Sequence, residues 1–149
     1  MGYKGAVNGE SKQKGTRYEM LFITKCMKMG LHPHDTVGDY LQHDMLVMND
    51  AGCVHKDQVK GTNYSETERR KTPRYRITAK KGNNTSVKSG LGKLDCTKID
   101  ILAAYVEPCD VWYLIPCLAI KSMAVWLYPD IENSKATYEK YKENWDCFF

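Results

Sequence analysis

Residues 53–62 have the sequence CVHKDQVKGT, and Gly61 ends the run of strand-forming residues. We expect a β-strand over Cys53–Lys60. Successive side chains of a strand point to opposite faces of its sheet, so Gln58 and Lys60 share one face and Asp57 lies on the other. The stretch therefore predicts a strand that carries an amide and an ammonium group side by side.

The segment before this strand predicts a neighbour that pairs with it. Asp44–Met48 is a compact apolar run that begins with an acid. The Asn/Asp/Gly cluster at 49–52 is typical of a hairpin loop. We therefore expect Asp44 at the start of one strand and Gln58 on the strand paired with it.

The rest of the chain predicts one mixed α/β or α+β domain over residues 1–149, a length that fits a single domain. Apolar residues recur at helical spacing over Arg17–Met29, with Thr16 as the N-cap and Gly30 after the last turn. His32 and His34 fall in an expected loop. Further strands are predicted at Arg74–Ala79, Ile101–Val106, Val111–Ile115 and Met123–Tyr128, and a closing helix at Lys135–Asn144.

The composition excludes some classes of protein and draws attention to one segment. Apolar residues make up 42% of the chain, and no stretch approaches the ~20 apolar residues of a membrane span, so we expect no membrane partner. The net charge is only +4, but twelve Lys and Arg stand against four Asp and Glu between Lys56 and Lys98. This basic segment favours a phosphate-facing surface about as much as a solvated loop.

The cysteines and the N-terminus predict a cytoplasmic protein with reduced thiols. Six cysteines form no CxxC pair, which argues against a structural zinc site. Residues 1–14 are polar, without the apolar core of a signal peptide, and we expect them to be flexible.

Four polar residues fall in an order that suits phosphodiester hydrolysis: Glu19 on the first helix, Asp44, and then Gln58 and Lys60 on the paired strand. Mg²⁺ binds hard oxygen ligands and can activate water near neutral pH. A carboxylate and an amide oxygen would supply such ligands, and a neighbouring Lys would stabilise charge on the phosphate.

At these residues the sequence resembles the PD-(D/E)XK homing endonucleases associated with group I introns, which often have Gln-x-Lys where other nucleases have Glu-x-Lys. The resemblance is carried by Gly15–Glu19, Asp44, His55–Thr62, Asp100–Pro116 and Tyr138–Lys142. It implies a restriction-endonuclease-like fold, with a mixed sheet flanked by helices. It also implies a cytoplasmic enzyme, encoded by a prokaryote or phage, that cuts double-stranded DNA as a dimer or tetramer.

The resemblance also implies roles for the site residues. Asp44, Gln58 and the backbone carbonyl of Val59 would bind Mg²⁺, with Mn²⁺ as a substitute, and Glu19 would hold a metal-bound water. Lys60 would position the attacking water. His43 stands where the family has Pro, and Gln58 where most nucleases have an acid, which is expected to weaken metal binding.

Residues 64–98 have no clear counterpart in the family and are expected to form an insertion that recognises the DNA target. The basic residues expected to contact DNA are Arg69, Arg70, Lys71, Arg74, Arg76, Lys80, Lys81 and Lys88.

Each of these residues also has an ordinary structural interpretation. Glu19 could be the acid of a capping box, Asp44 could cap a turn, and Gln58 and Lys60 could be solvated residues of an edge strand. Two other functions stay open as well. The protein could be a structure-selective nuclease such as a Holliday junction resolvase, or a catalytically silent nucleic-acid-binding module on the same fold.

Overall fold

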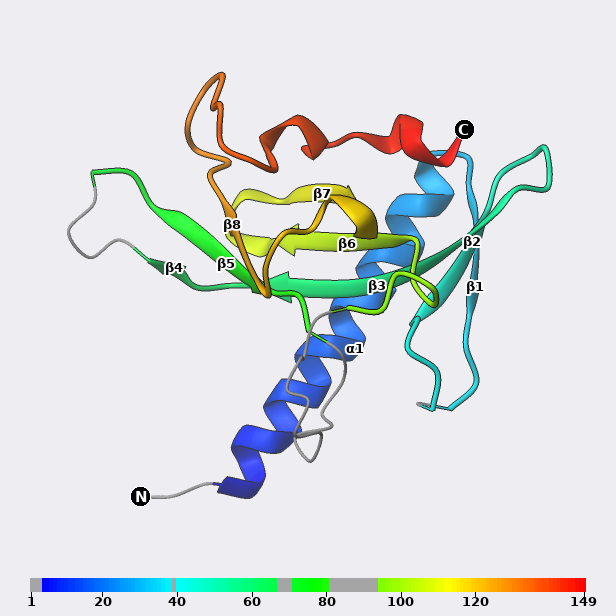
Figure 1. Cartoon of the computed structure of the whole chain (residues 1–149). Coiled ribbons are helices and arrows are strands. Elements are labelled where there is room, and N and C mark those ends of the chain that lie inside the picture. The colour runs from blue at the N-terminus through cyan, green and yellow to red at the C-terminus, as the bar shows by residue number, and fades with distance from the viewer. Residues whose placement is uncertain (1–3, 39, 67–70, 81–93) are drawn as a thin grey trace.

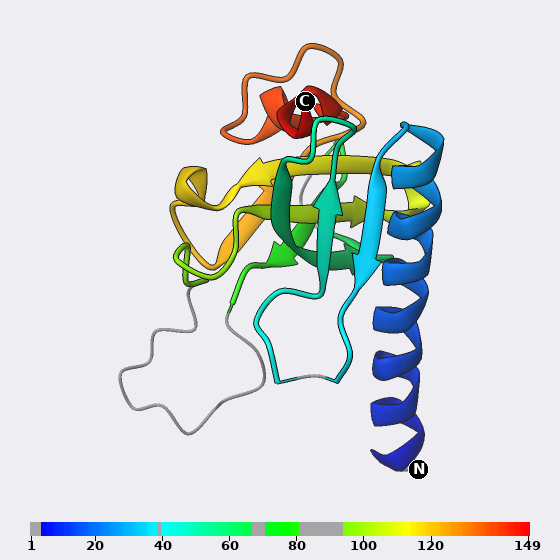
Figure 2. The same ribbon diagram turned by 90° about the vertical axis from the view of Figure 1, so that its right-hand side faces the viewer.

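The computed structural model describes residues 4–38, 40–66, 71–80 and 94–149. One α-helix and two β-sheets form three layers, with the helix and the smaller sheet on opposite faces of the larger sheet (Figures 1 and 2). The helix is α1 (Lys4–Lys28), and the larger sheet contains, in order, β1 (His32–Asp35), β2 (Met45–Met48), β3 (Val54–Thr62), β6 (Ile101–Val106) and β7 (Val111–Pro116). The smaller sheet contains β4 (Ser65–Glu66), β5 (Arg74–Thr78) and β8 (Ala124–Leu127).

The larger sheet is mixed, as the sequence predicts. β3 runs parallel to β6, and the other neighbouring strands of this sheet are antiparallel. The predicted hairpin is confirmed, because β2 pairs with β3 across the turn at 49–52. The pairing of β2 covers β3 only from Val54 to Asp57, whereas β6 pairs with β3 from Asp57 to Thr62. β3 therefore extends beyond β2, and this difference in length creates the site described below.

Two hydrophobic cores lie on the two faces of the larger sheet. Between the sheets, Leu102 and Ile115 pack with Ile77 of β5. Beneath α1, Ala103 packs with Phe22. Adjacent residues of β6 thus enter different cores, so this strand is covered on both faces.

The first helix is longer than the sequence analysis expects. α1 begins at Lys4 rather than Arg17, so residues 4–14 are helical. Thr16 lies inside the helix and is not its N-cap. The preceding residues contain good helix formers and no proline, so the helix extends beyond the apolar stripe that packs on the sheet. The predicted end is confirmed, because Gly30 has φ of 79° just after the last turn.

Two further local predictions are wrong. The segment with His32 and His34 is not a loop but the edge strand β1, where the missing N–H of a proline can be tolerated. The expected closing helix Lys135–Asn144 is reduced to a 3-10 turn, η3 (Glu139–Tyr141).

The closing segment is non-helical because it covers the edge of β7 instead. The backbone N–H of Glu143 donates to the Trp112 carbonyl at 2.7 Å, and the N–H of Trp112 donates to the Glu143 carboxylate at 2.9 Å. Glu143 also has φ of 51°, outside the helical region. Bonds to the sheet thus replace those of a helix.

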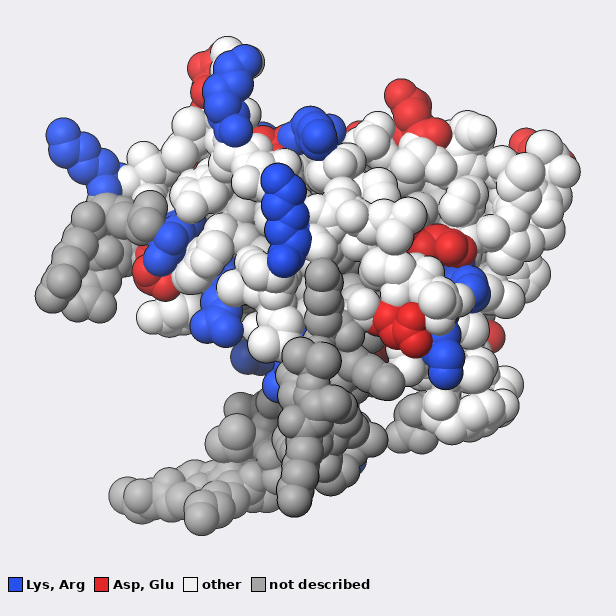
Figure 3. Space-filling view, viewed as in Figure 1, with Lys and Arg blue, Asp and Glu red and all other residues white. Residues whose placement is uncertain are grey.

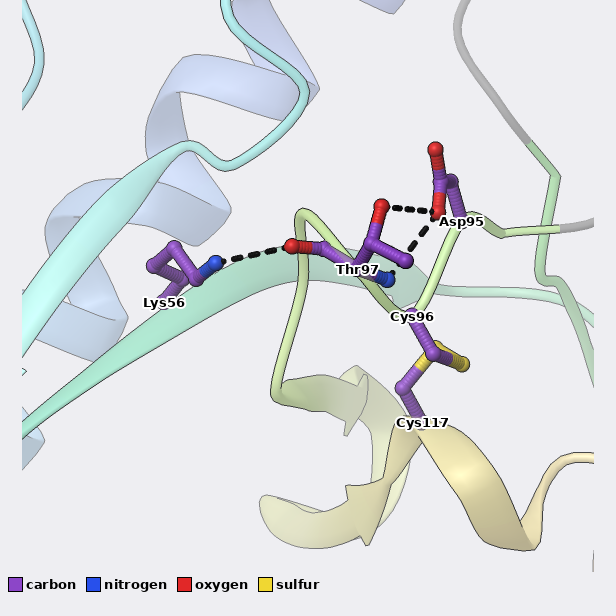
Figure 4. The surroundings of a disulfide bond; sticks show 5 residues. All are labelled: Lys56, Asp95, Cys96, Thr97 and Cys117. Atoms are coloured by element: carbon purple, nitrogen blue, oxygen red, sulfur yellow. Dashed lines mark hydrogen bonds between the residues drawn. A yellow bond between two sulfur atoms is a disulfide. The ribbon is translucent and has the colours of Figure 1, made fainter.

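The expectation that all thiols are reduced is wrong. Cys96 and Cys117 form a disulfide between the turn before β6 and the 3-10 turn η2 (Cys117–Ala119) that follows β7 (Figure 4). The turn at Cys96 is also held by Lys56, whose ammonium donates to the Thr97 carbonyl at 3.0 Å. Sequence separation hides this pairing, because the two cysteines meet only after β6 and β7 have paired.

Candidate active site

Asp44 occupies the position where β2 stops covering β3. Its backbone N–H donates to the Asp57 carbonyl at 2.8 Å, and its carboxylate Oδ2 accepts the N–H of Val59 at 2.8 Å. The Asp44 side chain thus replaces the backbone hydrogen bond that a longer β2 would form with β3 at Val59. Since the N–H and C=O of one strand residue point to the same edge, the Val59 carbonyl also faces this opening.

Gln58 supplies an amide oxygen at the same level of β3. Its side chain is buried, with 6% of its surface exposed. The amide Nε2 donates to the backbone carbonyl of Gln42 at 3.4 Å, whereas the buried Oε1 has no hydrogen-bond partner among the residues that the structure describes. A buried oxygen without a donor is costly unless another group binds it, which makes Gln58 Oε1 a candidate ligand.

Glu19 reaches the same place from α1. The helix continues on both sides of it, so Glu19 does not belong to a capping box at the helix start. Burial, together with the negative charges of Asp44 and Asp35, raises the pKa of Glu19 to about 7. This interaction shows that the carboxylates of the helix and of the β2 start lie close together.

The environment of Asp44 contains opposing influences on its charge. Burial raises the pKa of Asp44. The N–H of Val59, the ammonium of Lys60 and the ring of His43 act against burial and favour the carboxylate form. Lys60 is thus close enough to Asp44 for their charges to interact, in the arrangement that the sequence pattern predicts.

The face assignments along β3 are confirmed. Asp57 is opposite Met45 and Ile101 in the sheet, and both pack beneath α1. Asp57 is fully buried there, and desolvation raises the pKa of its carboxyl well above the usual range, with the charge of Asp100 adding to the effect. Gln58 is opposite Leu102, on the other face.

β3 is not an edge strand of its sheet, since it lies between β2 and β6. Gln58 is buried, so its interpretation as a solvated residue of an edge strand is wrong, whereas Lys60 is half-buried. Only the portion of β3 beyond Asp57 lacks the cover of β2. Glu19 approaches this opening from one face of the sheet, and Gln58 and Lys60 approach from the other.

Three contributors to the site are absent from the sequence analysis. The Gln42 carbonyl orients the Gln58 amide, and Asp35 at the end of β1 adds negative charge beside Glu19. Gly61 is the third, because a Cβ there would lie 2.7 Å from Cγ of the Tyr18 ring. A glycine directly after a Gln-x-Lys run was the available signal for such a close approach.

The basic residues predicted to contact DNA fall into several environments. Arg76 and Lys80 are exposed, as is Lys71. The guanidinium of Arg74 stacks 3.6 Å above the Trp126 ring centroid and forms an ion pair with Glu66 at 2.7 Å. The remaining predicted contacts lie outside the described residues: Arg69, Arg70, Lys81 and Lys88.

A hollow lies between the end of β3 and the basic strand β5. Thr62 shares a face of β3 with Gln58 and Lys60, since side chains alternate. Thr62 also lines a hollow of about 360 Å³ together with Tyr64, Glu66, Arg76 and Thr78. The face of β3 that carries the Gln-x-Lys pattern is therefore continuous with a polar groove beside β5.

The described residues contain neither a cluster of metal-binding side chains nor a membrane-spanning helix. Among the described residues, no group of three His, Cys, Asp or Glu side chains is arranged to hold a metal ion, so any metal at the site would need the amide and carbonyl oxygens as well. In the part of the chain that the structure describes, no helix has the length and apolar character required to cross a membrane.

Comparison with known proteins identifies the class. The model of the PD-(D/E)XK endonuclease family matches residues 9–148. A solved structure of a bacterial homing endonuclease, I-Ssp6803I, is similar with a TM-score of 0.68 and 25% sequence identity, over 91% of this chain and 88% of that one. No curated protein matches the sequence.

The chain belongs to the PD-(D/E)XK endonuclease family. It has the restriction-endonuclease-like α+β fold that the sequence resemblance implies, with one α-helix on the sheet in the part of the chain that the structure describes.

Proposed function

We propose that this protein is a Mg²⁺-dependent endonuclease that cuts double-stranded DNA at specific sites, as a homing endonuclease does. The observation that carries the proposal is the placement of Asp44 where β3 extends beyond β2, bonded to Val59 and interacting with Lys60, beside the unpartnered oxygen of Gln58 in the described residues. The similarity to a bacterial homing endonuclease supports the choice of substrate.

The donor set fits a hard divalent cation such as Mg²⁺ or Mn²⁺. Asp44 offers a carboxylate, Val59 a backbone carbonyl, and Gln58 an oxygen that is buried without a hydrogen-bond partner in the described residues. Glu19 would act through water. When bound, the cation would polarise the phosphodiester and lower the pKa of a coordinated water.

The residues of the chain would organise this chemistry. The N–H of Val59 fixes one carboxylate oxygen of Asp44, and the Gln42 carbonyl fixes the orientation of the Gln58 amide. The Lys60 ammonium would hold the attacking water and offset charge on the phosphate. Because the Asp44 carboxylate and the Gln58 amide are held before DNA arrives, they need little reorganisation at the moment of reaction.

The outer face of the smaller sheet would contact the DNA backbone. Tyr75 and Ile77 point into the core, so Arg74, Arg76 and Thr78 point outward. Figure 3 shows Lys and Arg side chains across the face formed by β5 and β8. Cutting both strands requires two active sites, so the protein would act as a homo-oligomer, a dimer or a tetramer.

The test is cleavage of a random-sequence duplex library in Mg²⁺ or Mn²⁺. We expect Lys60→Ala to abolish cleavage while it keeps the fold and most DNA binding, since one cation contributes a modest share of affinity. Lys56→Ala is the matched control, because Lys56 lies on the same face of β3 but bonds to Thr97 instead. Asp44→Asn should also abolish cleavage.

Two outcomes would replace the proposal. A four-way junction that outcompetes every linear duplex would favour a junction resolvase. DNA binding that is independent of divalent ions, without nicking in Mg²⁺ or Mn²⁺, would indicate a silent binding module.

A further inference from the structure

Residues 40–44 connect an exposed apolar pair to the proposed catalytic acid. The structure assigns no helix or strand to this segment. The Tyr40 side chain is 80% exposed and that of Leu41 is 44% exposed. Asp44, at the other end, is half-buried. Large apolar side chains gathered at an exposed site in this way mark an interaction surface.

The end of this segment near the site is firmly held, whereas the Tyr40 end projects. The N–H of Asp44 bonds to the Asp57 carbonyl at 2.8 Å, and the carbonyl of Asp44 accepts the hydroxyl of Thr36 at 3.2 Å. The Gln42 carbonyl accepts the Gln58 amide at 3.4 Å. Tyr40 is thus joined directly to backbone that orients two of the proposed metal ligands.

The Tyr40 ring has a defined place at the surface. It lies against Gly38, where a Cβ would come within 3.1 Å of two ring carbons. Gly38 has φ of 82°, a conformation that L side chains rarely adopt. The backbone at Gly38 thus leaves room for an aromatic ring that remains open to solvent.

Chain length limits how far Tyr40 can be from the reacting phosphate. Four residues span at most about 14 Å between Tyr40 and Asp44. Successive base pairs are about 3.4 Å apart along the duplex, so the backbone of Tyr40 lies within about four base pairs of that of Asp44, and the two side chains extend this reach further.

The charges near the segment indicate which part of the DNA it would meet. The acids Asp35, Asp44 and Glu19 are close enough for their charges to interact and would repel phosphates, although His43 and Lys60 offset part of this charge at Asp44. Tyr40 and Leu41 are uncharged, and an aromatic ring can stack on a base or wedge between base pairs. A base-directed contact therefore suits this segment better than a backbone contact.

We propose that Tyr40, supported by Leu41, enters the DNA groove beside the scissile phosphate and positions the duplex at the metal site. The proposal rests on the proposed DNA endonuclease function. In this role Tyr40 is a positioning residue, because it acts on the duplex and not on the reacting atoms.

The experiment uses a duplex that the unmodified protein cleaves, selected from the random library, with 2-aminopurine placed within about four base pairs of the mapped cut. Binding of the unmodified protein should change the fluorescence of 2-aminopurine at one of these positions. Tyr40→Ala should remove this change and slow single-turnover cleavage by about 10- to 100-fold, since a small misplacement of the substrate is enough for such a loss.

Three controls separate positioning from folding and metal binding. Tyr40→Phe should restore both the fluorescence change and cleavage, because it keeps the ring. Phe149→Ala should have no effect, since Phe149 is also exposed but lies at the end of the molecule opposite the chain between β1 and β2 (Figures 1 and 2). Mn²⁺ binding without DNA should be equal in the Tyr40→Ala and unmodified proteins.

The outcomes distinguish the two proposals. Normal cleavage and fluorescence in Tyr40→Ala would overturn the role of Tyr40 and leave the endonuclease function intact. A self-association of the unmodified protein that Tyr40→Ala abolishes, with cleavage kinetics per site unchanged, would assign the segment to a second copy of the chain instead. Absence of any DNA cleavage by the unmodified protein would overturn the endonuclease function, and this inference with it.

Discussion

Replacing Gly61 with alanine should destabilise the protein and also disturb the active site. A Cβ at Gly61 would lie 2.7 Å from Cγ of the Tyr18 ring, too close for two carbon atoms. Tyr18 cannot easily move, because its ring meets Tyr105 edge-on at 5.9 Å and Tyr105 stacks on Trp112 at 4.4 Å. The strain must therefore be relieved by a shift of α1 relative to β3.

The expected loss of stability follows from two opposing effects. Alanine in a strand is favoured over glycine by about 0.5–1 kcal/mol, because it loses less backbone entropy on folding. Overpacking a well-packed core costs about 1–3 kcal/mol. With the Tyr18 ring confined, we expect Gly61→Ala to lower the free energy of unfolding by about 1–2 kcal/mol.

The same substitution should lower activity beyond its effect on stability. Glu19 follows Tyr18 directly on α1, so a shift of the helix moves its carboxylate away from Asp44. A displacement of about 1 Å can cost about 100-fold in rate. Cleavage by the folded Gly61→Ala protein should therefore fall by at least tenfold, measured under single-turnover conditions at a temperature well below unfolding.

Two variants make the measurement decisive. Gly15→Ala lies on the same helix with nothing within 4 Å of its Cβ, so it should stabilise the protein by about 0.5–1 kcal/mol in urea titrations. Adding Tyr18→Leu to Gly61→Ala should recover part of the lost stability, and the double-mutant cycle should give a coupling of at least about 0.5 kcal/mol. If Gly61→Ala is as stable as the unmodified protein, α1 does not pack against β3 as described.

Three further variants test separate features. Burial raises the pKa of Asp57, so the folded protein binds the carboxyl proton more tightly than the unfolded chain does. The free energy of unfolding should therefore fall as the pH rises above about 4. Asp57→Asn should remove this pH dependence, measured by thermal unfolding. Gln58→Glu adds a second negative charge beside Asp44 and removes an amide donor, so calorimetry should show lower metal-free stability and tighter Mn²⁺ binding without DNA. Arg76→Glu with Lys80→Glu should weaken DNA binding and reduce the slope of log K against log salt, by about 0.9 for each lost phosphate contact; an unchanged slope would place the DNA surface elsewhere.

The strands and their faces were predictable because they depend on local patterns. The apolar runs at Ile101–Val106 and Val111–Ile115 form β6 and β7 at nearly the expected bounds. The alternation of side chains along Cys53–Lys60 correctly separated Asp57 from Gln58 and Lys60, because the period of a strand leaves no other arrangement.

Other features were not predictable because they depend on distant parts of the chain. The closing segment has the composition of a helix, but its carboxylates bond to β7 and to the loop after β8; Glu139, for example, accepts the Tyr113 hydroxyl at 3.0 Å. The Cys96–Cys117 disulfide likewise joins segments that meet only through the sheet. Helix propensity and cysteine spacing are local signals, so they predict neither the bonds of the closing segment to β7 nor the disulfide pairing.

The site itself combines both kinds of information. Alternation places Gln58 and Lys60 on the face opposite α1, so a sheet fully covered along both edges would separate them from Glu19. β2 begins at Met45 and leaves β3 uncovered beyond Asp57, so this edge of the sheet is open to side chains from both faces. Asp44 closes this opening only in part, through one bond to the N–H of Val59. The proposed site therefore depends on the relative length of two paired strands and not on the Gln-x-Lys pattern alone.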